Sequence, residues 1–286
     1  MQILCLGPDG TYGHQVAHEI NKRYFGGRGE IVFRKSHEEI LAQLDRAKDS
    51  NVVGVVAIRN STAGLVMEVV RFWLNSSPLR IIGEVDLPIH HQLLARPGVS
   101  LKEVQSVFSH PQGLAQCEQT LNALGIGERK PVASTAGAAK MVSDRDGKEA
   151  AISSRFCAEL YGLEILQQNL EDVPGNTTRF QILANVPGVL PAWKYDSDNR
   201  KMAAVWTVKN EVGALYKVLR EIYKAGLNME FIASVQFGGM NNVAFYGEMD
   251  APPQEEEQER ILQAISSVVE TIVCLGVFSK GTAIEE

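Results

Sequence analysis

The chain has 286 residues, of which 45% are hydrophobic and 22% are charged. This balance is typical of a folded globular protein and excludes a disordered or fibrous one. At roughly 100 to 200 residues per domain, the length predicts about two domains. The net charge of -6, without a cluster of basic residues, argues against a nucleic-acid partner, because such binding depends on neutralising phosphates.

Cysteine usage and hydropathy predict a cytoplasmic protein. The four cysteines form no CxxC pair, which favours a reducing compartment. The first residues resemble a buried strand rather than a signal peptide. The longest nearly apolar stretch, residues 52–58, is far shorter than the ~20 residues of a membrane span. We therefore expect no membrane contact. The cysteines are Cys5, Cys117, Cys157 and Cys274.

The first 185 residues alternate between strand and helix patterns, which predicts an α/β fold. The apolar run 52–58 has no polar face, as expected for a strand of a parallel sheet that is covered on both sides. Strands are predicted at 2–6, 31–34, 52–58, 81–85, 105–109, 150–152 and 180–184, and helices at 14–24, 36–48, 61–74, 111–124 and 136–142.

A second domain is predicted after a linker. Residues 186–200 combine prolines, an apolar patch and a polar run, which is linker composition. We therefore divide the chain into residues 1–185, a linker at 186–200 and a domain at 201–286. The last part reads as strand 202–208, helix 212–225, strand 228–237, strand 243–249, helix 255–271 and strand 273–278, the βαββαβ order of a ferredoxin-like module.

Small polar residues begin several predicted helices of the first domain, in the segments 7–13, 60–64 and 134–139. Taken singly, each is most simply a helix cap. Together they indicate a small anionic ligand, because the N–H groups of a helix N-terminus attract negative charge. The glycines of the first segment do not have dinucleotide-binding spacing, and no P-loop is present.

Two further segments carry candidate residues. Thr178 and Arg179 precede the strand 180–184, where the guanidinium either holds a carboxylate or makes a surface ion pair. His110 follows the strand 105–109, where it either titrates near neutral pH or caps the next helix. His90 and His91 are adjacent in a predicted strand, so they point to opposite faces and do not share a metal.

Taken in order, these motifs resemble those of the prephenate dehydratase family: GPDGTYG at 7–13, AIRNSTAG at 57–64, SHPQGLAQC at 109–117, STAGAA at 134–139, YGLEIL at 161–166 and NTTRF at 176–180. The C-terminal part resembles an ACT domain, with a GAL turn at Gly213, Ala214 and Leu215. The resemblance implies a two-lobe, periplasmic-binding-protein-like (type II) catalytic domain, followed by a ferredoxin-like ACT domain.

The family converts prephenate to phenylpyruvate in phenylalanine biosynthesis, losing CO2 and the ring hydroxyl, without a cofactor or metal. By resemblance, the catalytic residues are Thr178, which orients or protonates the hydroxyl, Arg179, which clamps a carboxylate, and Asn60. The resemblance also implies a homodimer or homotetramer. The substrate-binding residues it implies are Thr11, Arg59, Ser61, Gln112, Ser134, Thr135 and Phe180.

The chain departs from the family at two positions of this site. Arg59 replaces the glutamate of a PIEN motif, and Gly13 replaces a serine. If Arg59 faced the cleft, the charge of the cleft would differ by two units from that of a relative with glutamate at this position. This leaves open a prephenate decarboxylase that retains the hydroxyl, and a catalytically inactive two-lobe sensor. The intact motif at 178–180 favours the dehydratase.

The ACT part departs as well. The family's ESRP motif, which supports phenylalanine binding, reads Ala-Ser-Val-Gln at 233–236. We therefore expect phenylalanine to act weakly or not at all, although the residues of the GAL turn still offer an allosteric pocket. Alternatively, the ACT domain serves only to assemble subunits.

Overall fold

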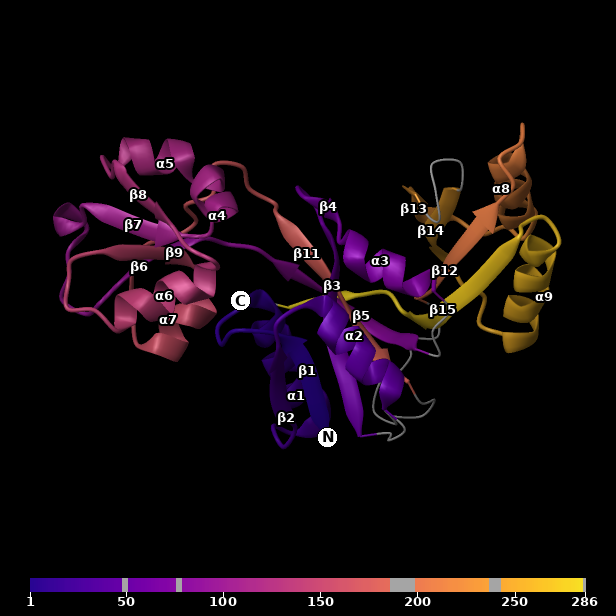
Figure 1. Cartoon of the computed structure of the whole chain (residues 1–286), viewed down its shortest axis with the longest axis horizontal. Helices are drawn as coiled ribbons and strands as arrows, with labels where there is room; N and C mark the ends of the chain where they lie inside the picture. The colour runs from indigo at the N-terminus through magenta and orange to yellow at the C-terminus, as the bar shows by residue number, and fades with distance from the viewer. Residues whose placement is uncertain (48–50, 76–78, 186–198, 237–242, 285–286) are drawn as a thin grey trace.

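The structure is a computed structural model that describes residues 1–47, 51–75, 79–185, 199–236 and 243–284. Three bodies lie in a row, and the N-terminal lobe is in the middle (Figure 1). The predicted linker falls almost entirely at 186–198, outside the described residues. Among the described helices, none is long and apolar enough to cross a membrane.

Lobe I is built on a mixed sheet with the strand order β16-β5-β11-β3-β1-β2. Strands β1, β2 and β3 are parallel as expected, whereas β11 runs antiparallel between β3 and β5. Helix α1 (Tyr12–Phe25) packs on one face, and α2 (His37–Arg46) and α3 (Met67–Trp73) pack on the other. The strands are β1 (Gln2–Leu6), β2 (Glu30–Arg34), β3 (Val52–Asn60), β4 (Gly64–Leu65), which pairs with β3, β5 (Arg80–Pro88), β11 (Thr177–Ala184) and β16 (Thr282–Ala283).

Lobe II has a five-stranded sheet with the order β10-β6-β9-β7-β8 between two helical layers. Its strands are β6 (Gln92–Ala95), β7 (Ser106–Ser109), β8 (Glu128–Pro131), β9 (Ala150–Ser153) and β10 (Glu164–Gln167). Its helices are the 3₁₀ turn η1 (Leu101–Glu103), α4 (Pro111–Gln116), α5 (Glu118–Ala123), α6 (Thr135–Ser143) and α7 (Arg155–Tyr161).

Two chain segments, 89–91 and 168–176, cross between the lobes and are hydrogen-bonded to each other. The Ile89 N–H donates to the Asn176 carbonyl at 2.8 Å, and the Leu170 N–H donates to the His91 carbonyl at 2.8 Å. The His91 N–H also donates to a Glu171 carboxylate oxygen at 2.9 Å. Two lobes joined by paired crossing segments confirm the predicted two-lobe architecture.

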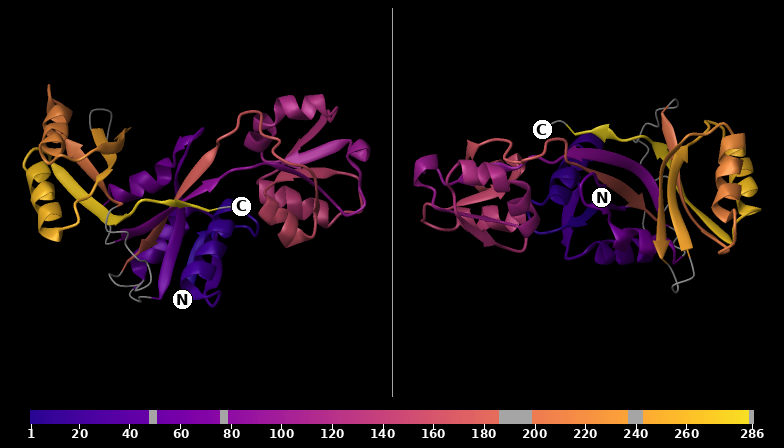
Figure 2. Two further views of the ribbon diagram at one scale, coloured as in Figure 1. Left: turned by 180° about the vertical axis from the view of Figure 1, so that it is seen from behind. Right: turned by 90° about the horizontal axis from the view of Figure 1, so that it is seen from above.

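The C-terminal domain has the predicted βαββαβ order, with β12 (Arg200–Val208), α8 (Ala214–Lys224), β13 (Met229–Gln236), β14 (Val243–Asp250), α9 (Glu255–Ser266) and β15 (Thr271–Ser279). Both helices cover one face of its sheet (Figure 2). The other face packs on lobe I, where Tyr246 and Phe278 share a core with Ile58 and Trp73. The chain end then leaves this domain, because β16 pairs with β5 of lobe I and Ile284 is buried there.

Several predicted bounds were wrong for local reasons. The helix expected at 61–74 begins only at Met67, because the chain first makes a turn and the short strand β4. Gly64, the first residue of β4, has a φ of +81°, which is not a helical conformation. The helix expected at 111–124 is broken at Cys117, whose φ of -116° and ψ of 17° are not helical. Strand β8 was not predicted, because its sequence, Glu-Arg-Lys-Pro, contains no alternation of apolar and polar residues.

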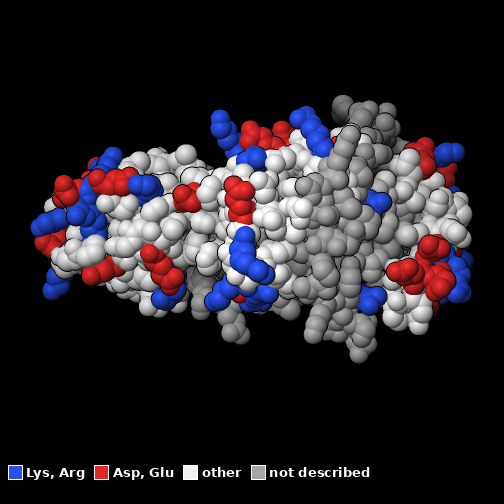
Figure 3. All heavy atoms as spheres, turned by 90° about the horizontal axis from the view of Figure 1, so that it is seen from below, with Lys and Arg blue, Asp and Glu red and all other residues white. Residues whose placement is uncertain are grey.

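The surface carries charged side chains of both signs. On the face drawn in Figure 3, acidic and basic side chains lie interspersed, without a continuous basic patch. The acidic run 255–257 occupies the first turn of α9, where negative charge complements the helix dipole.

Candidate functional site

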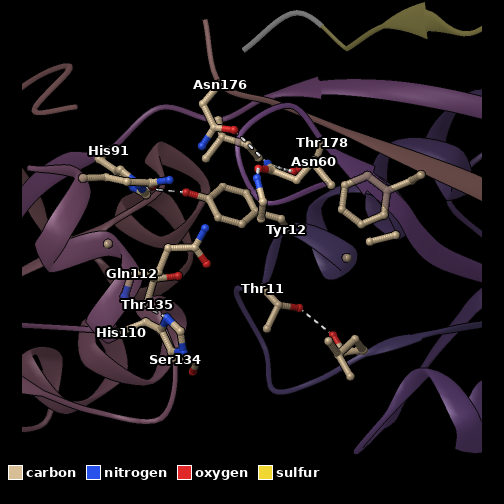
Figure 4. A pocket seen from close by; sticks show the side chains of 18 of the residues that line it. Thr11, Tyr12, Asn60, His91, His110, Gln112, Ser134, Thr135, Asn176 and Thr178 are labelled. Atoms are coloured by element: carbon tan, nitrogen blue, oxygen red, sulfur yellow. Dashed lines mark hydrogen bonds between the residues drawn. The ribbon is translucent and has the colours of Figure 1, made fainter. Parts of the chain in front are cut away.

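A cavity of about 370 Å³ lies between lobe I and lobe II (Figure 4). Aliphatic, amide, hydroxyl and imidazole groups line it, and its lining contains no Asp, Glu, Lys or Arg. Lobe I contributes Leu6, Thr11, Tyr12, Gly13, His37, Val55, Ala57, Asn60, Ala63, Thr178 and Phe180; lobe II contributes His110, Gln112, Gly113, Gln116, Ala133, Ser134 and Thr135; and the crossing segments contribute Ile89, His91 and Asn176.

Helices α1, α2, α4 and α6 each place a residue of their first turn in the cavity lining, and α1 and α6 begin there with a hydroxyl cap. Thr11 caps α1, because its hydroxyl oxygen accepts a hydrogen bond from the His14 N–H at 3.2 Å. The same hydroxyl donates a hydrogen bond to the Leu6 carbonyl at 2.6 Å. Ser134 caps α6 and accepts from the Gly137 N–H at 2.9 Å. Thr11 therefore uses both its proton and its oxygen within the protein, whereas Ser134 uses its oxygen as an acceptor, and each helix offers a ligand the positive end of its dipole.

Asn60 and Thr178 form a hydrogen-bonded pair across β3 and β11. The Asn60 amide nitrogen donates to Thr178 Oγ1 at 2.9 Å and to Asn176 Oδ1 at 2.7 Å. The Asn60 oxygen accepts from the Thr62 and Ala63 N–H groups at 3.0 and 2.9 Å. This pattern fixes which way the amide points.

The orientation of Asn60 determines what Thr178 can do. Since the Thr178 oxygen already accepts from Asn60, its own proton is available for an acceptor in the cavity. Thr178 is thus presented as a hydrogen-bond donor, on the wall opposite Gln112 and Thr135 of lobe II (Figure 4).

His91 is a buried imidazole of the cavity wall, only 3% exposed. Its Nε2 lies 2.8 Å from Gln116 Oε1, and its Nδ1 lies 3.4 Å from the Tyr12 hydroxyl. Burial lowers the pKa of His91 below its usual value, against the opposing effects of Gln116 and Glu171. The ring is therefore neutral near pH 7, with Nε2–H donating to Gln116 and Nδ1 accepting.

The two adjacent histidines diverge, as expected. Nδ1 of His90 lies 2.7 Å from a Glu171 oxygen and joins the crossing segments, whereas His91 faces the cavity. Among the described residues, no group of His, Cys, Asp and Glu side chains has the arrangement of a metal site.

His110 acts as a helix cap, the simpler of its two predicted roles. Its Nδ1 accepts from the Gln112 N–H at 3.3 Å at the start of α4. Both residues line the cavity.

The expected role of Arg179 as a carboxylate clamp requires correction. Arg179 follows Thr178 on β11, so the two side chains point to opposite faces of the sheet. Its guanidinium forms two bonds of 2.7 Å to Asp86, outside the cavity lining. Ser61 also lies outside that lining, and its hydroxyl accepts from the Thr177 N–H at 3.0 Å.

The expected role of Arg59 in substrate binding is corrected in the same way. The pairing of β3 with β11 shifts so that Arg179 pairs with Arg59 and Phe180 with Ala57, which leaves Ile58 as an extra residue. Such a bulge changes the direction of the side chains that follow. Arg59 therefore leaves the cavity and stacks on Phe231 of the C-terminal domain, 4.2 Å from the ring centre.

The residues that sequence reasoning missed are Tyr12, His37, His91, Gln116 and Asn176. Tyr12 and Asn176 lie within the quoted motifs, two residues or fewer from selected ones, so their motifs were a usable signal. Gln116, at the end of α4, also lies within a quoted motif, whereas His37, at the start of α2, lies outside every quoted motif, and only the three-dimensional arrangement brings it here.

The comparisons with known proteins agree with this geometry. Residues 3–187 match the family described as "Prephenate dehydratase". The chain belongs to the prephenate dehydratase family. A prephenate dehydratase of Methanocaldococcus jannaschii is 32% identical over 277 residues, covering 96% of each chain. The solved prephenate dehydratase of Arthrobacter aurescens, in complex with L-Phe, is 25% identical with a TM-score of 0.83, covering 98% of this chain and 90% of that one.

A third relative in this family has a second activity. The bifunctional N-acyl-homoserine lactone acylase/prephenate dehydratase of Komagataeibacter europaeus is 34% identical over 230 residues, covering 79% of each chain.

The buried His91 predicts how stability depends on pH. Its pKa is lowered in the folded protein from 6.5, so the unfolded chain binds more protons near and below that pH. We expect the free energy of unfolding to fall as the pH drops below about 6.5, and to fall less steeply in His91→Gln. Urea unfolding between pH 5 and pH 8 measures this. His18→Gln, at an exposed position of α1, is the control; equal slopes for wild type and His91→Gln would contradict the prediction.

Proposed function

We propose that this protein is a carbon–oxygen lyase that converts prephenate to phenylpyruvate, with loss of CO2 and water. The observation that carries the proposal is the convergence on one cavity of the N-termini of α1 and α6 and the Asn60–Thr178 pair. Prephenate has two carboxylates and a ring hydroxyl, so the two helix ends suit its anionic groups and Thr178 suits the hydroxyl.

The reaction breaks two bonds that join the ring to its substituents. The bond to the ring carboxylate breaks, CO2 leaves, and its electron pair enters the ring as the carbon–oxygen bond breaks. The departing hydroxide takes up one proton and leaves as water. Catalysis therefore requires a donor at the oxygen on which negative charge develops.

Thr178 is proposed to supply that donor by hydrogen bonding. An aliphatic hydroxyl is too weak an acid to lose its proton near neutral pH, so Thr178 remains protonated and the proton taken up comes from solvent. Asn60 holds the Thr178 oxygen, which directs the hydroxyl proton into the cavity. The remaining proposed substrate contacts are Thr11 and Thr135 at the helix starts, with Ser134, Gln112 and Phe180.

The position of Arg59 favours dehydration over the alternative decarboxylation. The suspected change of charge at the site is absent, because Arg59 stacks on Phe231 outside the cavity. Gly13 does line the cavity, so of the two departures from the family's motifs it is the one that lies at the site.

Purified protein incubated with prephenate at neutral pH tests the proposal. We expect phenylpyruvate, identified by mass and absorbance. Thr178→Val should lower kcat/KM about 100-fold, since the donor is lost while the shape is kept, and Thr178→Ser should retain most activity. A product that retains the hydroxyl would indicate the decarboxylase, and absence of turnover would favour the sensor.

The C-terminal domain is proposed to be an ACT domain that assembles the protein, in the cytoplasm, as a homodimer or homotetramer. Tyr216, Leu219 and Tyr223 form an exposed stripe on α8, opposite its buried face, with the two tyrosines 65% and 81% exposed. We propose that a second copy covers this stripe. Basic residues flank it at 217, 220 and 224, and the exposed run 255–257 of the adjacent α9 is acidic, so a two-fold arrangement matches opposite charges.

Light scattering after gel filtration tests this assembly. Tyr216→Glu combined with Tyr223→Glu should reduce the mass by at least half, because two charges would be buried in the apolar contact. Val173→Glu, at a 70% exposed apolar residue of the 168–176 segment, is the control and should leave the mass unchanged. A monomeric wild-type protein would contradict the proposal.

Phenylalanine is proposed to be a weak effector at most. Residues 233–236 lie on β13 and lack the family's Glu, Arg and Pro, although Gly213 still begins α8 with a φ of +79°. We expect micromolar phenylalanine to change the rate of prephenate turnover by less than about twofold. Strong inhibition in that range would show that the altered motif still binds the amino acid.

A further inference from the structure

Two arginines lie directly behind the Asn60–Thr178 pair. Arg59 precedes Asn60 on β3, Arg179 follows Thr178 on β11, and the register places the two arginines opposite each other. Like charges at paired positions of neighbouring strands repel each other. Anions must therefore lie near them on the face of the sheet turned away from the cavity.

Lobe I provides two of these anions and the C-terminal domain provides the third. Asp86 makes both 2.7 Å bonds to Arg179, and Glu84 Oε1 lies 3.8 Å from Arg179 Nη1. Glu248 of β14 places Oε2 3.4 Å from the same Nη1. Burial raises the pKa of Glu248, but Lys201, Tyr246 and Arg59 more than offset this and lower it below its usual value.

A buried lysine completes the cluster. Lys201 of β12 is 0% exposed, and its Nζ lies 2.5 Å from Glu248 Oε2 and 2.6 Å from Glu84 Oε2. The cations Arg59, Arg179 and Lys201 thus face the anions Glu84, Asp86 and Glu248, and Glu230, which is paired with Lys280, lies 4.0 Å from Lys201 Nζ. Removing one member of such a buried set leaves a charge without compensation.

The backbone needs this support at this point. The pairing of β3 with β11 shifts between Arg179 and Phe180, so the regular hydrogen-bond ladder is interrupted beside Thr178. The side-chain bonds of Arg179 connect the interrupted segment to β5 and to the C-terminal domain. The geometry of the Asn60–Thr178 pair therefore depends on contacts behind the sheet.

We propose that Glu248 is a positioning residue for the reaction in the cleft: by holding Arg179 and facing Arg59, it fixes the two strands that carry Thr178 and Asn60. The C-terminal domain thus acts on the site without touching the substrate. This inference rests on the proposed function for its kinetic readout and on hydrogen exchange for an independent one.

The test compares two variants, Glu248→Gln and Arg179→Lys. Arg179→Lys keeps the positive charge but loses the pair of hydrogen bonds to Asp86. In both variants we expect kcat to fall about tenfold and KM to stay within about twofold, because the cavity lining is unchanged and only the alignment of Thr178 suffers. Hydrogen exchange should increase in peptides spanning 57–61 and 176–180.

Lys148→Met is the control. Lys148 Nζ lies 2.5 Å from Glu103 Oε1 in lobe II, away from β3, β11 and the cluster. Its loss removes an ion pair and should leave kcat and exchange in those peptides unchanged. The combined variant Glu248→Gln with Arg59→Gln removes one anion and one cation and so keeps the wild-type net charge of the cluster, and we expect it to recover most of the lost kcat.

The outcomes separate this inference from the proposed function. If folded Arg179→Lys and Glu248→Gln turn over prephenate at the wild-type kcat, the positioning role is wrong and the dehydratase stands. If Glu248→Gln does not fold, Arg179→Lys and the charge-balanced double variant decide the matter. If wild type does not turn over prephenate, the exchange experiment still decides whether Glu248 orders the strand pair: exchange in the two peptides equal to that of wild type overturns the inference.

Discussion

The structure depends on the return of the chain from lobe II into the middle of the lobe I sheet. Strand β11 enters antiparallel between β3 and β5 and pairs with both along its length. One face of this strand reaches the cleft and the other reaches the C-terminal domain. Because successive residues of a strand point to opposite faces, Thr178 and Arg179 belong to two different environments although they are neighbours in sequence.

Much of this arrangement could be predicted from the sequence. The alternation of apolar strands and helices indicated the lobes, and the βαββαβ order indicated the C-terminal domain. The polar helix starts were also informative, since Thr11, Ser134 and Thr135 all line the cavity. Such local signals are reliable because capping and periodicity depend on residues only a few positions apart.

The errors concern features that are decided at a distance. The side-chain direction of Arg59 depends on the bulge at Ile58, and the bulge exists only in the pairing with β11, more than 100 residues later. Arg179 could have been separated from Thr178 by strand alternation alone, but the acids that it meets come from β5 and β14. A motif groups residues along the chain, whereas the sheet sorts them by face.

The last strand has a mechanical consequence. The C-terminal domain follows β11 in the chain and precedes β16, and both of these strands belong to the lobe I sheet, where β16 pairs with β5 beside Asp86. The domain also shares a core with lobe I, so the β16–β5 pairing is a second tie, formed by the segment that leaves the domain. Strand β5 thus holds β11, which carries Thr178, at one edge and β16 at the other, and the same strand links the cleft to the C-terminal domain.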